Sequence, residues 1–164
     1  MRVADVRSLF AYNEWANARI FSAAGKLDPE VFVAPRGSSF SSIRDTIAHI
    51  TMSEWVWLRR WRGESPSAPP DWASLQEAAA LTEKLREVEA DRAALLRELT
   101  DADLGRPRAY RNLKGDDFSE PLVDQLLHVV NHSTYHRGQV ATLSRQAGFA
   151  APATDLIVFK RETG

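Results

Sequence analysis

The sequence predicts an all-α fold, a four-helix bundle with long crossover connections and a short β-hairpin before the last helix. Three observations lead to this class. Four long segments carry apolar residues at helical spacing, prolines and glycines gather in the connections, and strand-like alternation surrounds Tyr110 and Leu113. A chain of 164 residues is long enough to bury one core without disulfides. We therefore expect residues 1–164 to form a single domain built on four helices.

The expected helices begin and end at recognisable signals. Ser41 and Ser42 are good N-caps for the second helix, and Ser74-Leu75-Gln76-Glu77 has the capping-box pattern that starts the third. The last helix begins near Pro121, which suits a first turn, and ends near Gly148. These signals predict helices over residues 3–24, 43–62, 75–99 and 121–148, a hairpin turn at 114–116 and a tail at 151–160.

Composition excludes several classes of function. The formal net charge is -1 and the isoelectric point about 6.4, and the short basic run at 59–62 does not form the basic face of a nucleic-acid binder. The chain has no cysteine, which removes disulfides, a thiol nucleophile and thiolate metal sites. The start, MRVADVRSLF, lacks the apolar stretch of a signal peptide, and no run approaches a membrane span. We expect a cytoplasmic protein without a nucleic-acid or membrane partner.

The four histidines are the most informative residues. His128, His132 and His136 follow one another at four-residue spacing, and His49 lies in an earlier expected helix. Two histidines one turn apart, such as His132 and His136, can bind one metal ion together. His128 and His136 are about 12 Å apart along the helix axis, too far for one ion to take all three. The third ligand must come from elsewhere: His49 is the only other histidine, and Glu54 is the fallback.

Several polar residues lie on the same helix faces as the apolar residues, which we call the apolar stripes. If the last helix packs by the stripe through His132, histidines and glutamines lie inside the bundle, where unpartnered polar groups are costly. This favours metal binding or catalysis over plain core packing. Gln139, Asn13 and Asn17 would orient a substrate or a ligating imidazole, or else bond to loop backbone in the core. Glu54 has a second interpretation as the buried partner of an arginine, and His128 is a residue of the pocket or of the shell around the ligands.

Three segments carry a family resemblance. The stretches YNEWANARIF, IAHITMSEWVWLRRW and LLHVVNHSTYHRGQVATLSRQAG, the last followed by PATDLIVF, resemble the DinB-like (damage-inducible protein) family over nearly the whole chain. The resemblance implies one DinB-like four-helix-bundle domain with metal ligands at His49, His132 and His136. The family includes transferases that act with bacillithiol and relatives that isomerise with mycothiol, so a thiol-dependent transferase is the activity it implies.

A three-histidine site leaves at least one coordination position free, as catalytic metal sites do. We expect one divalent ion, zinc or nickel, with iron or copper as alternatives, because imidazole ligands accept all of these. Since the chain lacks cysteine, a thiol would arrive as a small cosubstrate and react with an electrophilic small molecule. The alternatives are a metal-dependent hydrolase and a metal-binding stress-response protein without catalysis. The sequence does not indicate a catalytic residue.

Aromatic residues on a second helix face suggest a homodimer. Tyr12 and Trp15 lie opposite the main stripe of the first helix, and Trp55 lies away from that of the second. Large apolar groups on two faces of a helix need a cover, which a two-fold partner commonly provides. The loop around Trp72 or the tail at 150–160 would take this role in a monomer.

Overall fold

The computed structural model describes all residues, 1–164, and consists mainly of helices with one small antiparallel sheet. The long helices are α1 (Val3–Ala24), α3 (Ile43–Trp61), α4 (Ala78–Glu98) and α6 (Leu122–Gln146). The short elements are α2 (Pro29–Val33), the 3₁₀ helix η1 (Asp71–Ser74), α5 (Asp101–Leu104), β1 (Pro107–Arg111), β2 (Asp117–Pro121) and α7 (Leu156–Thr163).

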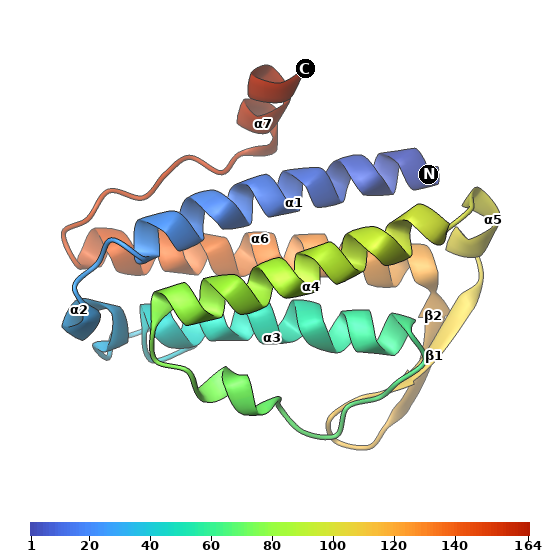
Figure 1. Ribbon diagram of the computed structural model, residues 1–164, viewed down its shortest axis with the longest axis horizontal. Coiled ribbons are helices and arrows are strands. Elements are labelled where there is room, and N and C mark those ends of the chain that lie inside the picture. Colours follow the sequence, from blue (N-terminus) through green and yellow to red (C-terminus); the bar gives the residue numbers. More distant parts are fainter.

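The four long helices form a bundle in which each packs against two others (Figure 1). The neighbouring pairs are α1 with α6, α6 with α3, α3 with α4, and α4 with α1. Helices α1 and α6 run in one direction and α3 and α4 in the other, so the connection between α3 and α4 returns along the length of the bundle. The predicted fold class, a four-helix bundle with a hairpin before its last helix, is confirmed.

Helix boundaries follow local hydrogen bonding. Ser42 caps α3 because its hydroxyl accepts the backbone N–H of Asp45. The predicted start of the third helix was too early. Ser74 instead ends η1, where its hydroxyl donates to the carbonyl of Asp71, and α4 begins at Ala78. A serine beside a Pro-rich segment can bond backward into a turn as readily as forward into a helix, so the pattern alone was ambiguous.

A hairpin and a C-terminal helix complete the fold around the bundle. Strands β1 and β2 pair in register, with Tyr110 opposite Phe118, and Gly115 takes a positive φ in their turn. The predicted tail contains a helix, α7, whose Phe159 is buried against the rings of Tyr12 and Trp15. This helix was not predicted from the sequence, because eight residues are too few to show a helical spacing of apolar residues.

The bundle core has two apolar clusters separated by a polar layer. One cluster includes Val6, Phe10 and Leu126, and the other includes Ile20, Ile47 and Leu81. The polar layer takes side chains from all four long helices: Glu14, Asn13, Asn17, Glu54, Glu89, Arg92, Ser133 and Arg137. The polar residues on the apolar stripes of α1 and α3 therefore belong to one layer.

The aromatic residues that suggested a homodimer have partners within the chain. Phe159 of α7 covers Tyr12 and Trp15, and the ring of Trp72 meets Trp55 edge-on at 6.2 Å. The tail and the Trp72 loop thus provide the cover, so these three residues do not require a second copy of the chain. No helix of the structure has the length and apolar character needed to cross a membrane.

Candidate metal centre

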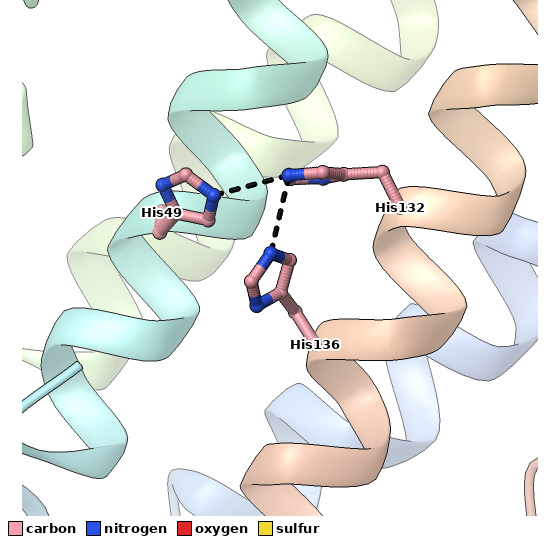
Figure 2. Close-up of side chains that lie close together, drawn as sticks. All are labelled: His49, His132 and His136. Carbon is pink, nitrogen blue, oxygen red and sulfur yellow. Dashed lines mark hydrogen bonds between the residues drawn. The ribbon is translucent and has the colours of Figure 1, made fainter. Parts of the chain in front are cut away.

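Three histidines from two neighbouring helices converge on one point (Figure 2). His49 projects from α3, and His132 and His136 project from consecutive turns of α6. The Nε2 atom of His132 lies 3.1 Å from Nε2 of His49 and 3.1 Å from Nε2 of His136. One nitrogen from each ring lies within 4.8 Å of the other two. The helical spacing on α6 and the packing of α3 on α6 together produce this cluster.

The spacing of these nitrogens suits ligation of one ion. Two nitrogens bound tetrahedrally at the usual zinc distance are separated by about 3.3 Å, close to the 3.1 Å observed. Hydrogen bonding alone explains the cluster poorly, because each neutral imidazole has one N–H and one free lone pair. The Nδ1 atom of His132 is buried and has no hydrogen-bond partner in the chain. The donor set and its geometry fit a divalent ion.

The three rings are held in the neutral form that binds metals. Burial, followed by the neighbouring His136, lowers the pKa of His49 to about 4. Burial, with His136 and His49 nearby, lowers the pKa of His132 to about 3. Burial also lowers the pKa of His136, against the opposing effect of its hydrogen bond with Gln139. Burial thus disfavours the protonated form of all three rings, so protonation competes less with a cation for their nitrogens.

Gln139 and Phe40 hold the rings in position. The Oε1 atom of Gln139 lies 2.7 Å from Nδ1 of His136 and accepts a hydrogen bond from its N–H, which leaves Nε2 free as a ligand. The Nε2 of Gln139 in turn donates to Ser39 at 3.1 Å. In the same loop, Phe40 stacks on His49 at 4.2 Å between ring centroids and meets His136 edge-on. Gln139 was predicted as a site residue but Phe40 was not, because residues in a loop follow no regular spacing from which the direction of a side chain can be predicted.

The histidines lie at the edge of the core, which corrects the predicted stripe of α6. His136 is buried, His132 is half-buried and His128 is exposed. The centre of the buried face passes through Ser133 and Arg137, which are 0% and 1% exposed. The packed face of α6 therefore centres on the residues that follow His132 and His136, not on the histidines themselves. A cluster at the edge is open to small molecules in a way that a central one would not be.

Glu54 is committed to the polar layer rather than to the histidines. Its Oε1 accepts hydrogen bonds from Asn13, Asn17 and Ser133 at 2.8, 2.9 and 2.8 Å. Its Oε2 pairs with Arg92, and both side chains are fully buried. Burial alone would raise the pKa of Glu54, but the Arg92 charge and these hydrogen bonds hold the pKa below its usual range. The interpretation of Glu54 as the buried partner of an arginine is confirmed.

Asn13 and Asn17 also belong to this layer. Each donates to Glu54 and accepts from Nη1 of Arg137, at 2.6 and 2.7 Å. The amides form core hydrogen bonds, as one interpretation expected, but their partners are side chains of other helices rather than loop backbone or the histidines. The sequence showed them as unusual on an apolar stripe, but their partners come from three other helices, which the pattern of one helix does not reveal.

His128 stands apart from the cluster. Its ring centroid is 5.6 Å from that of His132 and 5.2 Å from that of Trp57. Together with Trp57, Tyr110 and Asp124 it borders a pocket of about 230 Å³ beside the cluster. A second hollow of about 270 Å³ lies on the other side, next to Gln139 and Tyr135. The sequence left His128 as a residue of the pocket or of the shell around the ligands, and in the structure it lines this pocket.

The fold and the cluster define a helical-bundle protein with a three-histidine group suited to a divalent ion. The chain belongs to the DinB family, whose sequence model matches residues 1–163. Protein DinB of Bacillus subtilis (strain 168) is similar to it, with 30% identity over 94% of this chain and 94% of that protein. The family resemblance read from the sequence is confirmed.

Two solved structures share the fold. A DinB-like protein from Bacillus cereus ATCC 10987 superposes with a TM-score of 0.72 and 22% identity, over 93% of this chain and 97% of that one. YfiT from Bacillus subtilis has a TM-score of 0.67 and 20% identity, over 88% and 89% of the two chains. That protein is described as a probable metal-dependent hydrolase with an unusual four-helix bundle topology. At these identities both likenesses bear on the fold alone.

Proposed function

We propose that His49, His132 and His136 bind one divalent metal ion, zinc or nickel, and that the protein is a metal-dependent transferase which joins a small thiol to an electrophile. The convergence of three neutral Nε2 atoms at the spacing that one ion requires carries this proposal. A bound divalent ion would act as a Lewis acid, lowering the pKa of a thiol or water and presenting it as a nucleophile.

Residues of the chain itself would position the ligands and leave space for the substrates. Gln139 fixes the ring of His136 in the tautomer that leaves Nε2 free. Phe40 stacks on His49 and covers that side of the ring. The pocket beside His128 leaves space for a second molecule next to the proposed ion. Because the chain has no cysteine, the reacting sulfur belongs to a cosubstrate.

A hydrolase is the second candidate, favoured by the description of YfiT as a probable metal-dependent hydrolase. Hydrolysis at a metal site often uses a carboxylate near the ion as general base. Glu54 was the candidate for that role, but both of its oxygens are engaged in the polar layer and the side chain is fully buried. Glu54 is therefore not free to act as that base, which favours a thiol, because a thiol is more acidic than water and needs a base less.

The test begins with metal content. Untagged protein should contain about one divalent ion per chain, and His49→Ala, His132→Ala and His136→Ala should each reduce that content to near zero. His128→Ala is the matched control, because it removes the one histidine outside the cluster and should leave metal content unchanged. Full occupancy in His49→Ala would overturn the ligand assignment.

Activity is then measured on the metal-loaded protein. We expect metal-dependent conjugation of 2-mercaptoethanol to 1-chloro-2,4-dinitrobenzene, lost in His132→Ala. Metal-dependent cleavage of p-nitrophenyl acetate without conjugation would favour the hydrolase. Bound metal with neither reaction would favour the third alternative, a metal-binding stress-response protein without catalysis.

A further inference from the structure

The pocket beside the histidine cluster has a distinctive chemistry. It lies where the hairpin meets the first turns of α6, and its lining residues are Trp57, Tyr110, Glu120, Asp124, Gln125 and His128. His128 forms the boundary between the pocket and the cluster, since its ring neighbours that of His132. A molecule in the pocket would therefore reach toward the proposed ion.

We infer that this pocket binds a protonated amine carried on a flat apolar group, and that such an amine is part of the substrate of the metal site. The recognition of the amine stands on the pocket alone. Its role as part of the substrate rests on the proposed function.

The pocket carries more negative than positive charge. Glu120 and Asp124 both line it, and neither forms an ion pair within the chain. The cation that contacts its walls is Arg60, whose guanidinium carbon is 4.6 Å from the ring centroids of Trp57 and Tyr110. Two carboxylates and no lysine or arginine line the pocket itself, and this negative lining favours a cationic ligand.

Two acceptor atoms in the pocket wall lack a hydrogen-bond donor: Oε2 of Glu120 and Oε1 of Gln125. Gln125 is only 3% exposed, and its Nε2 donates to the backbone carbonyls of Arg108 and Glu120 at 2.7 and 3.0 Å. These two bonds fix the amide and leave its oxygen as the free group. An unpaired buried acceptor is costly, and a ligand with N–H groups would satisfy it.

The aromatic walls suit the apolar part of such a ligand. The rings of Trp57 and Tyr110 meet at 64° with centroids 4.9 Å apart, and His128 lies 5.2 Å from Trp57. Aromatic faces attract ammonium groups and stack on flat apolar groups. A volume of about 230 Å³ is small for a ligand pocket and fits a single ring with a short amine chain.

Binding of three matched probes tests the recognition: phenethylamine as the cation, 2-phenylethanol as its neutral isostere and phenylacetate as the anion. Isothermal titration calorimetry on the metal-loaded protein should show phenethylamine binding at least about tenfold more tightly than either other probe. The double variant Glu120→Gln, Asp124→Asn keeps the shapes of both side chains and should abolish that preference. Glu98→Gln, which removes an exposed carboxylate on α4, is the matched control and should leave it unchanged.

The outcomes separate this inference from the proposed function. Tighter binding of phenylacetate would indicate that the pocket binds an anion through the guanidinium of Arg60, and would overturn the inference. Equal binding of all three probes, or a preference that survives in the double variant, would do the same. Selective binding of phenethylamine by protein that binds no metal would uphold the recognition and reject the proposed function. Stoichiometric metal with thiol conjugation but without amine binding would uphold the proposed function and reject the recognition.

Discussion

At the scale of single residues, one glutamine sets the chemistry of a histidine. Gln139 accepts a hydrogen bond from the Nδ1–H of His136 at 2.7 Å, so the Nε2 of that ring keeps its lone pair free and directed to the cluster. Ser39 holds the glutamine from the far side at 3.1 Å. Such hydrogen bonds behind a ligand orient the ring and raise its basicity.

Loss of this bond should weaken metal binding. We expect Gln139→Ala to reduce the affinity for zinc by about 10- to 100-fold while leaving the fold intact. Competition with a chromophoric chelator measures the affinity, and circular dichroism checks the fold. Gln146→Ala, at an exposed position on the same helix, is the control. Gln139→Glu keeps an acceptor and should retain the affinity, whereas equal losses in both Gln139 variants would reject a positioning role.

At the scale of helices, the sequence predicts faces better than it predicts partners. The spacing of His132 and His136 was enough to place both rings on one side of α6. The residues alone left His49 and Glu54 as candidates for the third member, and the family resemblance implied His49. The rotation of α6 against its neighbours was not predictable in the same way. The predicted face centred on His132, but the packed face centres on Ser133 and Arg137. The apolar residues alone did not distinguish these two neighbouring faces.

The partners within the polar layer were also not predictable, because the pattern of one helix does not identify the residues of its neighbours. Asn13, Asn17 and Glu54 were recognisable as polar residues on apolar stripes, and an arginine partner for Glu54 was one of two interpretations. The partner is Arg92 of α4, a helix whose sequence pattern showed only its leucines and valines. From the sequence alone an arginine is predicted to lie at the surface, because arginine is mostly exposed unless it is paired.

The polar layer also has an unbalanced charge, which gives a prediction for Glu89. The layer contains three carboxylates, from Glu14, Glu54 and Glu89, and two guanidinium groups, from Arg92 and Arg137. Burial, followed by the Glu54 charge, raises the pKa of Glu89 to about 7. Protonation of Glu89 would bring the layer close to neutrality, so this side chain takes a proton more readily in the folded protein than in the unfolded one.

Stability should therefore depend on pH through Glu89. Between the ordinary pKa of 4.5 and about 7 the folded state binds the extra proton, so this group's contribution to stability decreases as pH rises through that window. Glu89→Gln should match the wild type at pH 4.5 and exceed its free energy of unfolding by about 1–2 kcal/mol at pH 8.5. Urea unfolding at both pH values measures this, with Glu98→Gln on the same helix as the control. A difference that does not change with pH would contradict the raised pKa.

At the scale of the whole molecule, α7 decides which surface the bundle presents. Phe159 is 7% exposed and lies on Tyr12 and Trp15 of α1, while the hydroxyl of Tyr12 donates to the backbone carbonyl of Thr154 at 2.9 Å. The C-terminal segment thus covers the aromatic face of α1 that would otherwise need a second copy of the chain. On the outer side of α7, Ile157 is 57% exposed.

Two substitutions on α7 distinguish an internal cover from a subunit interface. Phe159→Asp would bury a charge against two aromatic rings, so we expect α7 to detach and the exposed face of α1 to associate with another copy. Light scattering at micromolar concentration should give a monomer mass for the wild type and a mass that rises with concentration for Phe159→Asp. Ile157→Asp makes the same change on the outer side of α7 and should stay monomeric. A dimeric wild type that Ile157→Asp dissociates would instead place the outer face of α7 in a subunit interface and establish the homodimer predicted from the sequence.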